Sequence, residues 1–228
     1  MNRMARWDRA TASRAHRYVA ISHYVAGRIR RYYNREATVV YPPVDTEFFR
    51  PDAGIPGQHA LVVSALVPYK RVDLAIDACR LAGVPLTIVG DGPERASLER
   101  HAGSASSGSD DVTFLGRRSD NEIRDLYRRA AVVLLPGEED FGIVPLEAQA
   151  CGRPVVAYAR GGALETVIAG ETGVLVEEAS APAFAAAIRH AIDHPFDPRP
   201  IRMHAERFGR ARFAGEIEAV VRETSTTW

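Results

Sequence analysis

Short apolar runs alternate with helical segments along the chain after residue 60, and this alternation limits the possible folds more than any other feature. The runs are continuously apolar, which is typical of strands that are buried on both faces of a sheet. Between them, apolar residues recur at helical spacing. Repeated strand–helix units therefore predict an α/β fold with a doubly wound, Rossmann-like parallel sheet. The expected strands cover residues 60–66, 85–89, 112–115, 131–135, 154–158 and 173–176.

Helices are expected between these strands and on either side of them. Ser119 and Glu122 have the spacing of a capping box, which marks the start of one helix. Ser22 precedes another periodic segment and is the expected N-cap of that helix. Residues 1–15 are rich in arginine and show little period, whereas residues 37–41 predict a short strand. The expected helices cover residues 21–33, 71–81, 94–101, 119–130, 142–151, a short segment ending near 168, a segment around 184–191 and residues 212–222, with a flexible loop at 103–109.

Glycine-bearing turns lie on the connections between strands and helices. The carboxyl ends of parallel strands share one edge of a sheet, so these turns are expected together at the edge where ligands bind. Each glycine alone could simply permit a tight turn. Several on one edge favour a ligand that carries phosphate. The turns contain Gly90 and Gly92, Gly116, Gly142, and Gly161 with Gly162.

Residues 136–147 join one such strand to the next helix and are rich in carboxylates. Glu138, Glu139 and Asp140 precede the helix, and Glu147 lies on it. The free N–H groups and the positive dipole end at a helix start suit a phosphate. This segment could therefore hold an anion with its backbone and sugar hydroxyls with its carboxylates.

Lys70 follows the first strand of the sheet, at the same edge. Of the 29 basic residues in the chain, 28 are arginine and Lys70 is the only lysine. An ammonium group on a flexible stem differs physically from a planar guanidinium. Lys70 is therefore a candidate for a specific role, with the adjacent Arg71 as a second cation.

Several nucleotide and hydrolase sites do not fit the sequence. A dinucleotide fingerprint would need a third glycine where Arg95 stands, and neither an ATPase P-loop nor a hydrolase Gly-x-Ser-x-Gly elbow is present. Glu139 and Glu147 could serve a glycosidase, but that reaction does not need a lysine and a phosphate-binding helix start. Residues 1–35 hold nine arginines against one acid, yet no fold or motif supports a nucleic-acid site.

Motifs in a fixed order resemble the retaining GT-B glycosyltransferases of family 4. The likeness runs from about residue 16 to the C-terminus. The segments 68–73 and 138–143 most resemble mannosyltransferase-like members of polysaccharide pathways, which favours GDP-mannose over UDP-sugars as the donor. The motifs are a first phosphate loop at 62–73, a second at 89–94, a base-pocket loop at 114–117, the Glu-x7-Glu segment at 139–147, and the stretches 161–165 and 172–176.

The resemblance implies roles for individual side chains. Lys70, assisted by Arg71, would neutralise the donor diphosphate, whose charge grows in the transition state. Glu139 would hold hydroxyls of the donor sugar near the reacting carbon, so that Lys70 and Glu139 are the expected catalytic residues. Glu147 would accept hydrogen bonds from the ribose. The family's usual arginine after the first strand is replaced by Ala65, so a two-cation clamp requires Arg71 as the substitute.

Backbone groups would complete the site. Main-chain N–H groups at the start of the helix would meet sugar hydroxyls and phosphate, and the base-pocket loop would read the base. Family members transfer without a metal, so the resemblance implies no metal site and no cofactor besides the nucleotide-sugar substrate. The implied donor-binding residues are Lys70, Arg71, Gly90, Gly92, Gly116, Arg117, Glu139, Phe141, Gly142, Ile143, Val144 and Glu147.

The resemblance covers only the donor half of such an enzyme. GT-B enzymes have two Rossmann-like domains, and residues 16–41 resemble only the last helix and strand of the acceptor domain. Pro42 and Pro43 form a stiff break. We therefore expect residues 1–43 to be a remnant of the acceptor domain with a linker, and residues 44–228 to be the nucleotide-sugar-binding domain.

The leading interpretation is the donor half of a retaining glycosyltransferase that moves a hexose, with mannose favoured, to a glycan or lipid-linked acceptor. A separate chain is one candidate source of the missing acceptor domain. The alternative is a nucleotide-sugar-binding subunit or truncated module that is inactive alone; a GT-B epimerase or phosphorylase lacks this combination of loops.

No apolar run reaches the roughly 18 residues of a membrane span. A cytoplasmic protein is expected, with at most peripheral contact at the inner face of the membrane.

Overall fold

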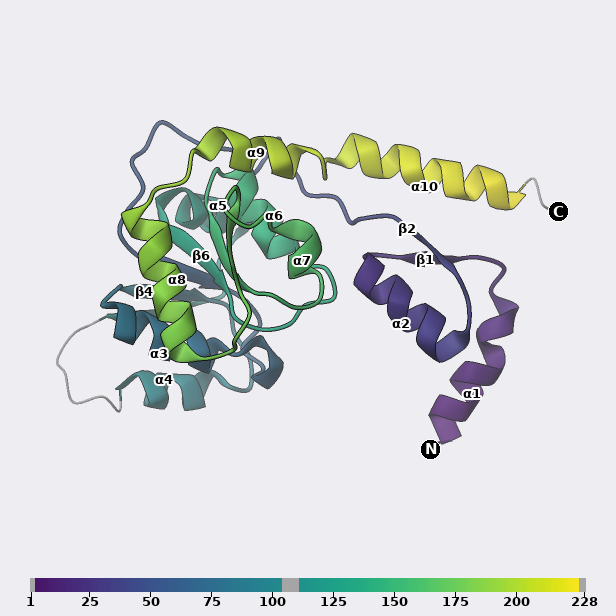
Figure 1. The fold of residues 1–228 in the computed structure, drawn as a ribbon, viewed down its shortest axis with the longest axis horizontal. Coiled ribbons are helices and arrows are strands. Elements are labelled where there is room, and N and C mark those ends of the chain that lie inside the picture. The colour runs from purple at the N-terminus through teal and green to yellow at the C-terminus, as the bar shows by residue number, and fades with distance from the viewer. Residues whose placement is uncertain (1–2, 104–110, 226–228) are drawn as a thin grey trace.

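The computed structural model describes residues 3–103 and 111–225, so the loop expected at 103–109 lies almost entirely outside the described residues. Figure 1 shows a larger lobe built around one sheet and a smaller lobe that contains the first two helices and strands. The last helix, α10 (Arg210–Ser225), runs from the larger lobe across to the smaller one (Figure 1).

The larger lobe is organised by a six-stranded parallel sheet. Its strand order is β5-β4-β3-β6-β7-β8, and every neighbouring pair is parallel. This arrangement confirms the predicted α/β fold with a doubly wound sheet. The strands are β3 (Ala60–Val63), β4 (Leu86–Val89), β5 (Val112–Gly116), β6 (Val132–Leu135), β7 (Val155–Tyr158) and β8 (Gly173–Val176).

The central strands β3 and β6 are covered on both faces, which explains why they are apolar throughout. Val62 and Leu134 join the core cluster on one face, whereas Leu61 and Val133 join the cluster on the other. Alternate side chains of a strand point to opposite faces, so a strand covered on both sides favours apolar residues at every position. Thr87 and Thr113 lie at less buried positions of β4 and β5. One face packs against α3 (Val72–Ala82), α4 (Arg95–Gly103) and α8 (Ala181–Asp193), and the other against α5 (Asp120–Arg129), α6 (Ile143–Ala150) and α9 (Pro198–Glu206).

The strand order changes direction beside β3. The chain runs outward from β3 through β4 to β5, then returns to place β6 on the other side of β3. The connections that leave β3 and β6 therefore diverge to opposite faces of the sheet. In open α/β sheets the crevice at such a switch point is where ligands bind.

Two helix starts follow their sequence signals. The Ser119 and Glu122 side chains form the predicted capping box at the start of α5. The Ser22 hydroxyl accepts a hydrogen bond from the main chain of Val25 and so caps α2 (His23–Tyr33), as predicted. Each cap satisfies N–H groups that the first turn of a helix leaves free.

Three elements were not expected from the sequence. Residues Arg3–Thr11 form the helix α1, which has no buried residue and exposes Trp7. Because no face of α1 is buried, its sequence lacks the repeated apolar spacing that would predict a helix. Strand β1 (Tyr18–Ala20) spans three residues and pairs in parallel with β2 (Ala37–Val39). Helix α9 begins at Pro198, and Asp197 caps it. Its two prolines suggest a break in the sequence, although proline is tolerated in the first turn of a helix.

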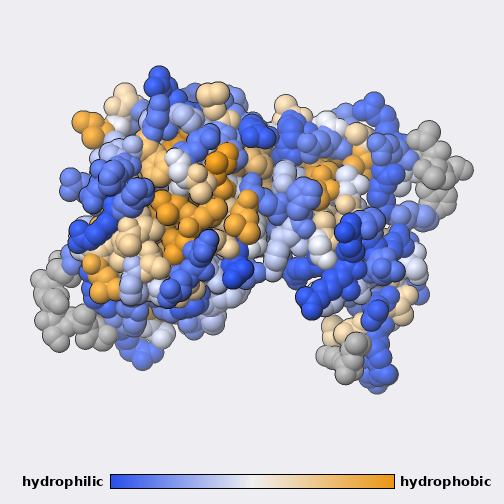
Figure 2. All heavy atoms as spheres, viewed as in Figure 1, coloured by the Kyte–Doolittle hydropathy of each residue, from blue (hydrophilic) through white to orange (hydrophobic). Residues whose placement is uncertain are grey.

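The smaller lobe has little core of its own. Neither α1 nor α2 has a buried residue, and the two-stranded sheet joins β1 to β2 only. Hydrophilic residues cover most of this lobe in the space-filling view, whereas apolar residues gather on the visible side of the larger lobe (Figure 2). Arg17 pairs with Glu223 of α10 at 2.6 Å, which ties the two lobes together. Among the described residues, no helix is both long and apolar enough to cross a membrane.

Candidate functional site

Lys70 and Glu139 meet at the switch point of the sheet. Lys70 ends a short 3-10 turn (Pro68–Lys70) after β3, and Glu139 lies in the connection from β6 to α6. The Lys70 ammonium contacts the Glu139 carboxylate, and their side chains are 16% and 19% exposed. The structure therefore brings the two predicted catalytic residues into one ion pair that is mostly buried but retains some exposed surface.

The loop after β4 is fastened to the loop after β3. The main-chain N–H of Leu66 donates to the Asp91 carbonyl at 3.0 Å, and the N–H of Gly90 donates to the Gly116 carbonyl at 2.9 Å. A side chain on Gly90 would place its Cβ 1.8 Å from the Ser64 carbonyl oxygen, and the φ of Gly90 is +129°. Gly90 and Gly92 thus allow the two loops to pack closely, whatever contact they make with a ligand.

The loops after β6 and β7 are fastened to each other in the same way. The N–H of Gly162 donates to the Glu139 carbonyl at 2.8 Å. A Cβ on Gly137 would lie 2.4 Å from the Tyr69 carbonyl oxygen, so the β6 loop also touches the loop that carries Lys70. Each connection at this edge, from that after β5 to that after β7, therefore contacts a neighbouring connection, and the Lys70–Glu139 pair joins those after β3 and β6.

Arg71 does not join this ion pair. Its guanidinium binds Asp73 at 3.2 Å, and its side chain is 43% exposed. Arg71 also adopts a left-handed backbone conformation, with φ of +52°, at the boundary between the 3-10 turn and α3. The second cation predicted for a clamp is therefore engaged with a neighbouring carboxylate.

The start of α6 presents main-chain N–H groups to the same crevice. Gly142 caps the helix with φ of +93°, and Ile143 and Val144 form its first turn. Phe141 is only 3% exposed because its ring stacks on Tyr41 at 5.5 Å. Phe141 can therefore serve a ligand through its main chain but not through its ring.

Glu147 lies one turn further along α6 and faces α5. Its carboxylate accepts a hydrogen bond of 2.8 Å from the hydroxyl of Tyr127, a side chain with no exposed surface. Burial raises the pKa of Glu147, and the Tyr127 hydroxyl partly opposes that rise. A half-buried carboxylate with one hydroxyl partner keeps lone pairs that can accept hydrogen bonds from ligand hydroxyls. Glu147 is therefore held by Tyr127, whereas Glu139 is held by Lys70.

Replacing Tyr127 by phenylalanine is expected to lower the free energy of unfolding by about 1 kcal/mol, because a buried hydrogen bond to a carboxyl group is lost. For a chain of this length that corresponds to a fall in Tm of about 2–4 °C. Differential scanning calorimetry measures the change, with Tyr32→Phe on the exposed side of α2 as the matched control. An unchanged Tm for Tyr127→Phe would contradict a role for this hydrogen bond.

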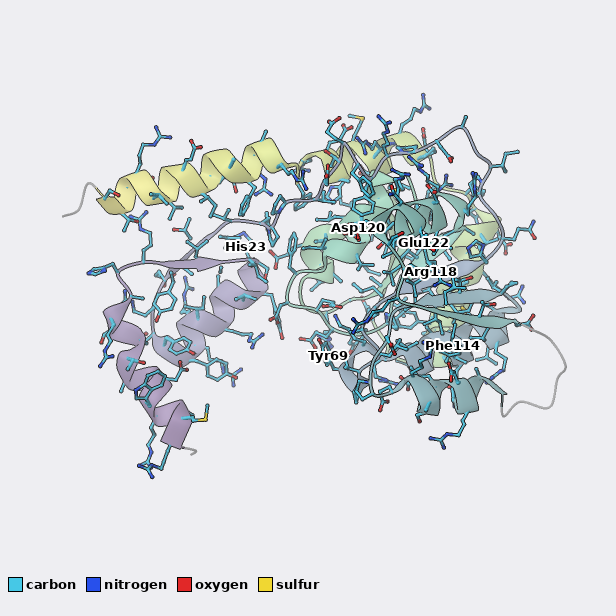
Figure 3. All side chains as sticks on the ribbon, turned by 180° about the vertical axis from the view of Figure 1, so that it is seen from behind. His23, Tyr69, Phe114, Arg118, Asp120 and Glu122 are labelled. Carbon is cyan, nitrogen blue, oxygen red and sulfur yellow. The ribbon has the colours of Figure 1, made fainter. Side chains whose placement is uncertain are left out.

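The predicted base-pocket loop lies at the end of β5 (Val112–Gly116), beside the loop after β4. Gly116 has φ of +68°, and Arg117 is exposed. Arg118 lies beside Asp120 and Glu122 at the start of α5 (Figure 3), and its guanidinium is 3.6 Å from the Glu122 carboxylate. Among the described residues, no group of three or more histidine, cysteine, aspartate or glutamate side chains is arranged to hold a metal ion.

Comparison with known proteins identifies the family. Residues 45–212 match the model of the glycosyl transferases group 1 family. The chain belongs to this family. This glycosyltransferase chain is 30% identical over 161 residues to an uncharacterized glycosyltransferase of Methanocaldococcus jannaschii, covering 70% of the chain and 45% of that protein. It is 33% identical over 201 residues to the D-inositol 3-phosphate glycosyltransferase of Mycolicibacterium smegmatis, covering 80% and 46%.

Solved glycosyltransferase structures share its fold. Sucrose-phosphate synthase from Thermosynechococcus elongatus is 26% identical with a TM-score of 0.85, over 98% of this chain and 62% of that one. Anabaena HepE in complex with UDP-glucose is 24% identical with a TM-score of 0.84, over 96% and 67%. The Rossmann-like fold therefore has GT-B neighbours and fits half of that architecture. The chain spans about half the length of the curated relatives it matches.

The sequence does not reveal the contacts of two further residues near this site. The spacing of Tyr127 marks only a buried helix face and gives no sign of a carboxylate partner. Glu165 belongs to the 161–165 stretch, and its carboxylate binds main-chain groups of His23 and Tyr24 in the smaller lobe. No local signal reveals a partner more than a hundred positions away in sequence.

Proposed function

We propose that this chain is the donor half of a retaining, metal-independent family 4 glycosyltransferase. The Lys70–Glu139 pair at the switch point is the observation that carries the proposal. A cation beside a helix start suits a diphosphate, and a carboxylate beside both suits the hydroxyls of the attached sugar. A bound donor would replace the contact within this pair: its diphosphate would bind Lys70, and its sugar hydroxyls would bind Glu139.

In the proposed reaction the bond between the anomeric carbon and the diphosphate oxygen breaks, and a bond to the acceptor oxygen forms on the same face of the sugar. The acceptor proton passes to the leaving phosphate. Lys70 stabilises the charge that develops on that phosphate. Glu139 orients the sugar, Glu147 holds the ribose, and the rim near Gly116 and Arg117 meets the base.

GDP-mannose is the proposed donor, with UDP-sugars as the alternative. The segments 68–73 and 138–143 support mannose through their likeness to mannosyltransferase-like sequences. HepE binds UDP-glucose in its solved structure, which supports testing uridine donors in parallel.

A glycan or lipid-linked molecule is the proposed acceptor, at the cytoplasmic face of a membrane. A cavity of about 500 Å³ lies between α1 and α2, and its lining includes Ile29, Tyr32, Tyr33 and Asp140. Asp140 is the neighbour of Glu139, so the cavity adjoins the sugar end of the proposed donor site. Aromatic faces and carboxylates together suit a carbohydrate or the sugar end of a lipid-linked acceptor.

The second candidate is a nucleotide-sugar-binding subunit that needs an acceptor domain from another chain. The absence of buried residues in α1 and α2 favours this candidate, because a lobe without a core is typical of part of a larger domain. Residues 1–43 would then be the acceptor-side remnant and residues 44–228 the donor domain.

We expect the purified chain to release little or no nucleoside diphosphate from GDP-mannose or UDP-glucose, with or without simple glycan acceptors. The measurement is a coupled assay of nucleoside diphosphate release, with boiled protein as the control. Robust turnover by the isolated chain would contradict the need for an additional acceptor domain. Donor binding without turnover would support the second candidate.

A further inference from the structure

Glu165 connects the two lobes at the start of α2. It lies in the short helix α7 (Ala163–Thr166), directly after the Gly161–Gly162 turn. One carboxylate oxygen accepts a hydrogen bond of 2.8 Å from the main-chain N–H of His23, and the other accepts one of 2.9 Å from that of Tyr24. His23 lies on the side of the smaller lobe nearest the larger lobe (Figure 3).

Both carboxylate oxygens of Glu165 accept hydrogen bonds in this contact between the lobes. The Tyr41 hydroxyl also donates to Glu165, at 2.9 Å. Burial, followed by this hydrogen bond, raises the pKa of Tyr41 to about 12, so the hydroxyl keeps the proton that it donates. A carboxylate at a helix start is stabilised both by hydrogen bonds and by the helix dipole. Glu165 thus holds the first turn of α2 at a fixed place against the larger lobe.

Helix α2 in turn holds the loop that carries Glu139. The Ser22 hydroxyl donates to the Asp140 carbonyl at 2.6 Å, and the Arg28 guanidinium binds the Asp140 carboxylate at 2.6 Å. The Tyr24 hydroxyl donates to the Glu138 carboxylate. The residues on both sides of Glu139 are therefore tied to α2.

We propose that Glu165 is a positioning residue of the donor site: by binding the start of α2 it fixes the loop 138–140 and so aims the Glu139 carboxylate at the donor sugar. Ser22, Tyr24 and Arg28 hold this loop from the α2 side, whereas the Gly162 N–H holds the Glu139 carbonyl from the larger lobe. Loss of Glu165 removes the anchor of the first turn of α2, and the contacts from α2 then hold the loop less firmly relative to Lys70.

This inference rests on the proposed donor site, and it predicts a distinctive pattern. Lys70 and Glu147 are placed to hold the nucleotide, whereas Glu139 is placed to hold the sugar. Loss of Glu165 should therefore weaken binding of the sugar moiety and leave the nucleotide contacts in place. A general folding defect would instead weaken both.

The test is isothermal titration of the full chain with GDP, GDP-mannose, UDP and UDP-glucose. For Glu165→Ala we expect the Kd of the favoured nucleotide sugar to rise about tenfold, while the Kd of its nucleoside diphosphate changes less than twofold. Glu165→Gln keeps one acceptor oxygen and should recover part of the loss. Glu218→Ala, at an exposed position of α10, is the matched control.

Tyr24→Phe supplies a second route if Glu165→Ala folds poorly, because it removes the tie between α2 and Glu138 and should show the same selective loss on a smaller scale. A parent chain that binds none of the four ligands would overturn the donor site itself. A parent that binds, with sugar affinity unchanged in both Glu165→Ala and Tyr24→Phe, would overturn only the positioning role. Equal losses for nucleotide and nucleotide sugar would also overturn it.

Discussion

Replacing Lys70 by alanine is expected to weaken binding of the nucleoside diphosphate and of the nucleotide sugar alike, by about 50-fold. A charge-assisted hydrogen bond from an ammonium group to a diphosphate is among the stronger polar contacts that a protein makes. The Lys70 ammonium lies at the switch point, whereas the adjacent Arg71 is engaged with Asp73. Isothermal titration with GDP and GDP-mannose, and with UDP and UDP-glucose, measures the loss.

The matched control for this experiment is Arg189→Ala, which removes an exposed cation of α8. We expect its donor affinity to equal that of the parent. Arg71→Ala should cost clearly less than Lys70→Ala, because the Arg71 guanidinium binds Asp73. An equal cost for both variants would assign Arg71 to the diphosphate after all, and parent-like affinity for Lys70→Ala would remove Lys70 from the site.

Replacing Glu147 by glutamine is expected to weaken donor binding about tenfold while making the protein more stable at neutral pH. Burial raises the pKa of Glu147, so the folded state binds its proton more tightly than the unfolded state does. The free energy of unfolding therefore falls as the pH rises through the range between the unfolded and folded pKa values of this group. Glutamine carries no charge and escapes this loss, yet it still accepts the Tyr127 hydrogen bond.

Thermal unfolding of both proteins across the acidic to neutral range measures the stability effect. The Tm of Glu147→Gln should exceed that of the parent near pH 7, and the difference should shrink as the pH is lowered and Glu147 becomes protonated. Donor affinity of the parent should fall over the same range, because a protonated carboxyl accepts hydrogen bonds from ribose less well. A Tm for Glu147→Gln below that of the parent at neutral pH would contradict a net cost of burying the charge of this acid.

The sheet could be predicted from sequence because its signal is local and repeated. Strand β8 covers the residues that the apolar run predicted, and the capping box of α5 involves only Ser119 and Glu122. Helix α1 could not be predicted, because a helix with no buried face carries little apolar period. The prolines at the start of α9 likewise predict an interruption of helical structure rather than the start of a helix.

The candidate site could be predicted only in part. Parallel topology places the loops after β3 and β6 side by side, so a meeting of Lys70 with Glu139 follows from strand order together with residue type. The partner of Glu147 depends on how α5 packs against α6, and the partner of Glu165 depends on how the two lobes meet. The Arg71–Asp73 pair depends on a left-handed residue at the helix boundary, which arginine seldom adopts.

Titration of the unmodified chain shows whether the loops after β3 and β6 bind a nucleotide sugar. Isothermal titration calorimetry would be run with GDP-mannose, UDP-glucose and their nucleoside diphosphates at up to millimolar concentration. We predict saturable binding of at least one nucleotide sugar at one site per chain, with GDP-mannose the tightest. No heat of binding for any of the four ligands at millimolar concentration would contradict the claim.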